Sequence, residues 1–342
     1  MKALKLDEVI EKFNKDEGEE IISLGLPKYE YDKIPFSSPR MNYCTYGGIP
    51  QGKIVELYGE QHGGKTTTAL DLVANYQKLE NAREVLWCDI ENALDAVWAT
   101  KIGVDLTTVH ILKPINQSAE TIFQLICDAI QTNEIGLVVI DSIAALVSAQ
   151  AMEKELTEKT YGGVSVALTN FVNKVVGLCQ GYNCTLIGIN QMRDVIGSMF
   201  PMQNTPGGRA WKHNSSVRME FRRGKFIDDK GNELTSSCEN PAGNIVLVSI
   251  TKTRCFPPNR RTGTYTINYA TGVDAMRDMF DLAIKYGAVD KKGAWFTIIN
   301  IETGEIIKDK LQGQATAFSY LEDNPDIYDL LSKQILTKMN ES

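Results

Sequence analysis

The 342-residue chain is too long for one compact core but long enough for a large domain with a smaller satellite. Its hydrophobic content of 43% and charged content of 23% are typical of a water-soluble globular protein, and its longest apolar stretch, residues 135–149, is interrupted by Asp141 and too short to span a bilayer. A formal net charge of −7 argues against a protein that coats nucleic acid by bulk positive charge alone.

Residues 1–33 form the first segment. Leu6, Val9, Ile10 and Phe13 have the spacing of a short amphipathic helix, and residues 21–31 read as an extended arm. A segment of this size cannot fold alone and should pack on something else. The first residues lack an apolar signal region, so a cytoplasmic location is expected.

Residues 34–270 alternate between strand-like and helix-like patterns. The predicted strands are 53–58, 85–89, 109–112, 136–141, 184–190, 215–221, 244–251 and 264–269, and the predicted helices are 66–80, 92–102, 117–132 and 164–181. Apolar strands separated by helices indicate an α/β fold with a mostly parallel sheet covered on both faces. The last three strands follow one another directly, which predicts an antiparallel edge.

Residues 271–342 change to a different pattern. Helices are predicted at 274–286, 315–322 and 324–339, around a small strand pair near Trp295 and Ile306. We therefore expect a separate small α+β domain here.

A complete phosphate-loop motif follows the first core strand. It reads Gly59-Glu60-Gln61-His62-Gly63-Gly64-Lys65-Thr66 and continues into a helix with Thr67. Glycines let backbone N–H groups face phosphates, and the helix N-terminus favours negative charge. Lys65 is placed to reach the β- and γ-phosphates and Thr66 to hold Mg²⁺. The alternative is a glycine-rich structural turn, but the strand–loop–helix setting predicts a nucleoside triphosphate site.

Further polar residues end the neighbouring strands. Asp141 ends an apolar strand and suits the Mg²⁺ shell opposite Thr66. Glu91 follows another strand and can act as a general base, or simply as a helix N-terminal acid. Asp95 and Trp98 can present an acceptor and an aromatic face to a ligand, although Trp98 also suits a core position.

Gln191 ends the strand at 184–190 and is placed to sense a γ-phosphate. Residues 192–208 follow it as a long irregular, glycine- and proline-containing loop, which is usually functional. Local basic stretches at 209–225 and 252–261 are either solvated faces or sites for a polyanion. The seven cysteines form no Cys-x-x-Cys pair and read as free thiols, and the three histidines are too scattered for a metal cluster.

Together these motifs resemble the RecA family of bacterial and phage recombinases, over residues 8–335. The resemblance is carried by residues 54–59, 64–67, 89–95, 189–193, 196–200, 293–296 and 322–325. By position it implies that Glu91 is the base for ATP hydrolysis and that Gln191 links the γ-phosphate to the DNA loop. It also implies that Asp95 and Trp98 contact adenine, with Trp98 standing where the family usually has tyrosine.

The resemblance also implies contacts with a neighbouring subunit and with DNA. Lys252 and Arg254 match a pair that reaches the neighbour's γ-phosphate; the second is usually lysine in bacterial members, so arginine changes the geometry. The implied DNA contacts are Tyr161 and Gly162 in a first loop (155–162) and Arg193, Ile196, Met199, Gly207, Gly208 and Arg209 in the second. Val166 and Asn173 replace arginines common in bacterial members, which is compatible with a phage-encoded protein.

The expected architecture is a RecA-like P-loop ATPase core (34–270), an N-terminal helix and polymerisation arm (1–33) and a C-terminal domain for duplex DNA (271–342). The expected function is homologous recombination in DNA repair: with ATP and Mg²⁺, a helical filament on single-stranded DNA pairs with homologous duplex and exchanges strands. Single-strand-binding or mediator proteins are further expected partners, and no membrane is. The alternatives are a hexameric helicase of the same fold and a single-strand coat protein clamped by ATP.

Overall fold

The computed structural model describes residues 5–17, 31–153, 163–194, 203–229, 232–235 and 238–341, and it divides into two units, 1–31 and 32–342. In the first unit, helix α1 (Leu6–Glu17) confirms the predicted amphipathic helix and exposes Leu6, Val9 and Phe13. The predicted arm at 21–31 lies, except for Tyr31, outside the described residues. No helix in the described ranges has both the length and the apolarity needed to cross a membrane.

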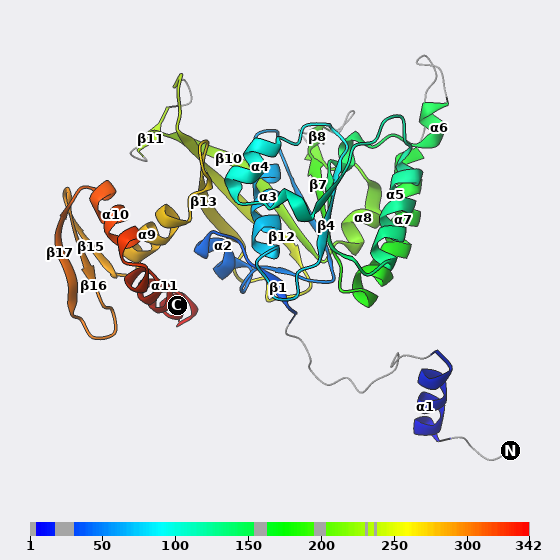
Figure 1. The fold of residues 1–342 in the computed structure, drawn as a ribbon, viewed down its shortest axis with the longest axis horizontal. Helices are drawn as coiled ribbons and strands as arrows, with labels where there is room; N and C mark the ends of the chain where they lie inside the picture. Colours follow the sequence, from blue (N-terminus) through cyan, green and yellow to red (C-terminus); the bar gives the residue numbers. More distant parts are fainter. Residues whose placement is uncertain are drawn as a thin grey trace. The chain divides into compact units, whose positions relative to one another are not determined.

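A ten-stranded sheet forms the centre of the second unit (Figure 1). Its parallel part comprises β3 (Ile54–Gly59), β7 (Thr185–Gln191), β6 (Ile135–Asp141), β4 (Glu84–Asp89) and β5 (Val109–Leu112), in that spatial order. On the other side, β3 pairs in parallel with β10 (Val217–Ile227), which is followed by the antiparallel strands β12 (Gly243–Thr253), β13 (Thr262–Asn268) and β14 (Gly272–Val273). The predicted mostly parallel sheet with an antiparallel edge is confirmed.

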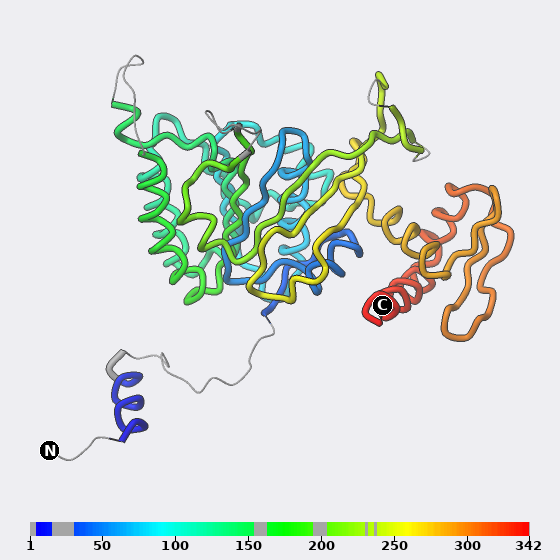
Figure 2. The backbone as a smooth tube through the Cα atoms, turned by 180° about the vertical axis from the view of Figure 1, so that it is seen from behind, coloured from blue at the N-terminus to red at the C-terminus, as the bar shows by residue number. Residues whose placement is uncertain are grey.

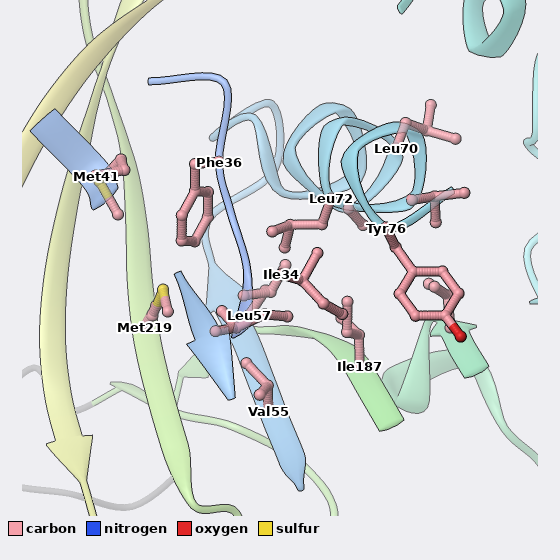
Figure 3. Close-up of a cluster of buried hydrophobic side chains, with 14 of the residues drawn as sticks. Ile34, Phe36, Met41, Val55, Leu57, Leu70, Leu72, Tyr76, Ile187 and Met219 are labelled. Carbon is pink, nitrogen blue, oxygen red and sulfur yellow. The ribbon is translucent and has the colours of Figure 1, made fainter. Parts of the chain in front are cut away.

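Helices cover both faces of the sheet. On one face, α3 (Lys65–Tyr76) packs over alternate strand residues such as Leu57 and Ile187 (Figure 3), and α4 (Ala96–Ile102) packs against α3. On the other face, α5 (Ala119–Gln131), α7 (Gly163–Gly181) and α8 (Gly208–Asn214) cover a second cluster that includes Phe123, Phe171 and Trp211. Because successive strand residues point to opposite faces, strands buried on both sides are apolar throughout, as the sequence indicated.

The strands β10 and β12 continue as a long antiparallel ribbon, which Figure 2 shows from behind. The short strand β11 (Glu233–Leu234) pairs with the end of β10. β12 runs antiparallel to β10, and β10 runs parallel to β3. The start of β12 therefore lies at the carboxyl ends of the parallel strands, where the phosphate loop lies, and the end of β12 lies at their amino ends.

The C-terminal part has its own core. Its helices are α9 (Ala275–Lys285), α10 (Gln314–Asp323) and α11 (Pro325–Glu341), and its sheet comprises β15 (Val289–Lys292), β16 (Trp295–Ile299) and β17 (Ile306–Gln312). The sequence predicted a strand pair, but β15 adds a third strand. The buried carboxylate of Asp278 accepts hydrogen bonds from the Ser38 hydroxyl and from the Arg40 N–H at 3.0 Å, which ties α9 to the core. The boundary at residues 270 and 271 stays a prediction.

Several short elements were not predicted, because each has too few residues to show a repeating pattern of apolar positions. They are β1 (Lys33–Ile34), α2 (Pro39–Cys44), β2 (Ile49–Pro50), η1 (Leu106–Thr108), η2 (Ile143–Ala145), α6 (Ala149–Met152), β8 (Arg193–Asp194), β9 (Gln203–Asn204), α8, β11 and β14. The helix predicted from residue 92 begins only at Ala96, because the Asp95 side chain caps it. The loop at 192–208 is less irregular than predicted, since β8 and β9 pair and bring its two ends together.

Candidate nucleotide and DNA site

The phosphate loop joins β3 to α3. Gly59 has φ +151°, and a Cβ there would lie 2.0 Å from the Phe221 carbonyl oxygen, so only glycine fits beside β10. Gly64 is the N-cap residue of α3 with φ +89°, and because glycine has no side chain, the first N–H groups of the helix have no side-chain cap. Lys65 is buried, and its Nζ donates to the carbonyls of Gly59 (3.2 Å) and Glu60 (2.5 Å). This arrangement of free N–H groups around an ammonium suits a phosphate anion.

The electrostatics of Lys65 also suit an anionic ligand. Burial lowers the pKa of the Lys65 ammonium, although Asp141, Glu91 and Glu60 oppose the shift. Burial disfavours the charged form because the ammonium loses water, and a bound phosphate would favour it again.

A cavity of about 490 Å³ lies beside the loop. Its lining includes the predicted residues His62, Gly63, Gly64, Lys65, Thr66, Thr67 and Trp98. Trp98 is partly buried, so it meets both the core and the cavity. The predicted residues Glu60, Gln61 and Asp95 are exposed and do not line it; Asp95 accepts the N–H groups of Val97 and Trp98 as the N-cap of α4.

Sequence reasoning missed four residues that line this cavity. They are Arg223 from β10, Asn244 from β12, Ile267 from β13 and Tyr269, which follows β13. The Tyr269 hydroxyl donates to the Asn244 side chain at 2.9 Å, so the two strands present a fixed aromatic ring to the cavity. No local motif marks these residues, because the sheet order alone brings β12 and β13 beside the phosphate loop.

An acidic cluster lies on the other side of the loop. The Thr66 hydroxyl donates to Oδ2 of Asp141 at 3.0 Å, so the two predicted metal ligands are adjacent. Burial raises the pKa of Asp141 to about 6; the Thr66 hydrogen bond lowers it, while Glu91 and Asp89 raise it. A hydroxyl and a carboxylate are hard oxygen donors that fit Mg²⁺, which usually takes only one or two protein ligands beside phosphate oxygens and water. No larger metal-binding group of side chains occurs among the described residues.

Glu91, the predicted base, is hydrogen-bonded on one carboxylate oxygen. Its Oε1 accepts from Nε2 of Gln191 at 2.8 Å and from the hydroxyl of Ser142. Three adjacent parallel strands, β4, β6 and β7, deliver these residues to the same sheet edge. The structure therefore brings together Glu91 and Gln191, which the sequence analysis had assigned separate roles, and it adds Ser142, which the sequence analysis did not single out.

A buried ionic network connects β3 with the second predicted DNA loop. Arg218 from β10 pairs with Glu56 from β3, and Asn190 donates to Glu56 at 2.9 Å. Asn190 also donates to the Pro206 carbonyl at 2.9 Å, which fixes the end of the loop to the core. Asn190 thus connects β3, the strand that leads into the phosphate loop, to the end of the second predicted DNA loop through two hydrogen bonds.

Lys252 and Arg254 lie at the sheet edge opposite the phosphate loop. The register aligns Lys252 with Arg218 and Arg218 with Glu56, three residues before Gly59. Nζ of Lys252 donates to the carbonyl oxygens of Lys212 (2.9 Å) and His213 (2.5 Å) at the end of α8. Burial, followed by repulsion from Arg254 and Arg218, lowers the pKa of Lys252 to about 8.

The predicted DNA contacts are described in part. Tyr161, Gly162, Ile196 and Met199 lie outside the described residues. Arg193 is exposed and donates to the Ala144 carbonyl at 2.9 Å. Gly207 and Gly208 have φ +101° and +74° and lead into α8, and the exposed Arg209 lies with Lys212 and Lys252 on the wall of a second cavity.

Two family models match the chain. A model described as the RecA N-terminal domain matches residues 4–274, and one described as the RecA C-terminal domain matches residues 277–340. Relatives named Protein RecA include that of Ruminococcus albus, 33% identical over 87% of this chain and 70% of the relative. The Thermotoga maritima protein is 33% identical over 89% of this chain and 82% of the relative. The Clostridium tetani protein is 35% identical over 82% of this chain and 75% of the relative.

Proposed function

The chain belongs to the RecA family and is a recombinase with DNA-dependent ATPase activity, and we propose how its residues perform this work. The observation that best supports the proposal is the hydrogen bond between Gln191 and Glu91 beside a complete phosphate loop. Gln191 directly precedes the loop that is predicted to bind DNA. The C-terminal match supports a recombinase over a hexameric helicase, since the helicase would lack that domain.

The proposed nucleotide is ATP with Mg²⁺. The N–H groups at the start of α3 and the Lys65 ammonium bind the phosphates, while Trp98 and Tyr269 contact the base from two walls of the cavity. The exposed Asp95, at the start of the helix that carries Trp98, is the proposed polar contact to adenine. Thr66 and Asp141 hold Mg²⁺, which neutralises phosphate charge when bound.

In the proposed hydrolysis, Glu91 accepts a proton from a water molecule as that water attacks the γ-phosphorus, and the bond from the γ-phosphorus to ADP breaks. Gln191 adjoins the second DNA loop through Met192 and Arg193, so its amide can report both DNA and nucleotide. A γ-phosphate acceptor would compete with Glu91 for the Gln191 amide donor. The second DNA loop and the general base Glu91 are thereby coupled through Gln191.

The neighbouring subunit completes the proposed site. Lys252 and Arg254 lie at the opposite sheet edge from their own phosphate loop, so they are better placed to serve the nucleotide of another copy. Two cations on the γ-phosphate would stabilise the charge of the transition state. Assembly of the filament would then depend on ATP.

The protein binds DNA and associates with itself, as its family does. We propose that the exposed apolar side of α1 docks on another copy together with the arm, and that residues 155–162 and 192–208 contact single-stranded DNA. Homologous duplex is proposed to meet the lysines of residues 271–342. ATP and DNA as substrates favour a location in the bacterial cytoplasm, whether the protein is encoded by the bacterium or by a phage.

The Glu91→Gln variant tests the proposed chemistry. The amide keeps the size of the side chain but removes the base, so ATP binding and filament assembly should persist while DNA-dependent turnover falls by ~10² or more. Nucleotide affinity and turnover are measured on the same preparation. Unchanged turnover would show that Glu91 is only a polar residue at the sheet edge.

A further inference from the structure

Ser142 occupies a defined place beside the proposed base. It follows Asp141 at the end of β6, its residue is 1% exposed, and its hydroxyl hydrogen-bonds to Oε1 of Glu91. In the strand order β7–β6–β4 it lies on the middle strand, between the strand that delivers Gln191 and the strand that delivers Glu91.

Both donors converge on the same carboxylate oxygen. Oε1 of Glu91 accepts from Ser142 and, at 2.8 Å, from Gln191. Oε2 of Glu91 has no hydrogen-bond partner within the described part of the chain. A carboxylate fixed at one oxygen keeps the other oriented for proton transfer.

The two donors differ in how firmly they are held. The backbone around Ser142 is fixed, because the N–H groups of Ile90 and Glu91 donate to the Asp141 carbonyl at 2.8 and 3.3 Å and Ala145 donates to the Ser142 carbonyl at 3.2 Å. Gln191, by contrast, is only half-buried and stands at the entrance to the second DNA loop. If its amide turns to a γ-phosphate, Ser142 is the donor that stays on Glu91.

We propose that Ser142 is a positioning residue for ATP hydrolysis, whose hydroxyl holds Oε1 of Glu91 so that Oε2 receives the proton of the attacking water. This inference rests on the proposed role of Glu91. In the step, a water O–H bond breaks, its proton passes to Oε2, the water oxygen bonds to the γ-phosphorus, and the electrons of the broken phosphorus–oxygen bond leave with ADP. Ser142 does not touch ATP and acts only through Glu91.

A buried hydroxyl needs a partner in any case, so the test must separate positioning from simple burial. The Ser142→Ala change is made in the wild-type chain and in Glu91→Gln, and steady-state ATP turnover is measured on single-stranded DNA. In the wild-type background kcat should fall roughly tenfold to a hundredfold, the range of one hydrogen bond to a charged group, with KM for ATP within about twofold. In the Glu91→Gln background the same change should cost less than about twofold, because the amide oxygen can still accept from Ser142 but no base remains to be positioned.

Two further variants sharpen the comparison. Ser142→Cys keeps the side-chain shape with a slightly larger atom but offers a much weaker donor, so it should also lower kcat, and it replaces the alanine variant if that chain fails to fold. Ser148→Ala is the matched control, because Ser148 is also 1% exposed while its hydroxyl has no partner among the described residues. It should leave kcat within about twofold of wild type.

Equal losses of kcat in both backgrounds, or a loss confined to KM, would overturn the inference and make Ser142 structural. Normal turnover by Ser142→Ala, while Glu91→Gln is inactive, would refute the role of Ser142 alone. Normal turnover by Glu91→Gln would instead refute the proposed base itself.

Discussion

The buried pair of Glu56 and Arg218 supplies a quantitative prediction. The Glu56 side chain is fully buried and that of Arg218 is 16% exposed, so Glu56→Gln leaves the guanidinium without a compensating charge. Removing one partner of a buried pair costs about 3–5 kcal/mol. Because Arg218 keeps slight exposure and lies 4.6 Å above the Tyr58 ring, we expect the lower end, about 3 kcal/mol.

Urea unfolding measures this loss, with fluorescence of the buried Trp87 and Trp211 as the signal. With a slope near 3 kcal/mol/M, the midpoint should fall by about 1 M. The double variant Glu56→Gln with Arg218→Met removes both charges and should recover most of the stability. A loss below about 0.5 kcal/mol in the single variant, or equal losses in both, would refute the argument that the two charges compensate each other.

The remaining predictions address Asp141 and the proposed DNA contacts. Because the pKa of Asp141 is raised to about 6, its carboxylate protonates as the pH falls through 6. The Mg²⁺-dependent part of ATP affinity should therefore weaken about tenfold for each pH unit below about 6. A Mg²⁺ effect that does not depend on pH would contradict the assignment of Asp141 as a metal ligand. Its burial penalty to folding is correspondingly complete above pH 6 and relieved as pH falls towards 3.8. Arg209→Ala should lower affinity for single-stranded DNA and reduce the slope of log K against log salt by about 0.7, whereas an unchanged slope would exclude a phosphate contact. Charge reversal of Lys291 and Lys310 should weaken duplex DNA binding but not binding of single strands; equal effects on both would contradict a duplex-specific C-terminal domain.

Much of the fold follows from local patterns in the sequence. Each of three segments is an unbroken run of residues: the phosphate loop and the apolar strands at 136–141 and 184–190. These elements, and their meeting at the carboxyl ends of the parallel strands, could therefore be predicted. Trp98 lines the cavity beside the phosphate loop, and the adenine contact that the family resemblance implies for it stays a prediction. Short elements such as α8, with Trp211 as its one buried residue, have too few turns to show a period.

The rest depends on which strands become neighbours. Asn244 and Tyr269 line the cavity only because β12 and β13 pair beyond β10, and nothing near them in the sequence indicates this order. Ser142 looks like an ordinary polar residue after a strand, and its contact with Glu91 appears only once β4 and β6 pair. Side-chain chemistry could be read along the chain, whereas partners across the sheet required the fold.

In the proposed mechanism ATP is hydrolysed between copies of the chain, with Lys252 and Arg254 serving a neighbour's nucleotide. The most direct measurement mixes Arg254→Ala with Lys65→Ala, each inactive alone, and follows ATP turnover on single-stranded DNA while co-assembly is verified separately. Some interfaces would then pair an intact phosphate loop with intact cations, so the mixture should recover part of the wild-type turnover. Co-assembled but inactive mixtures would contradict the shared site and the filament-coupled mechanism.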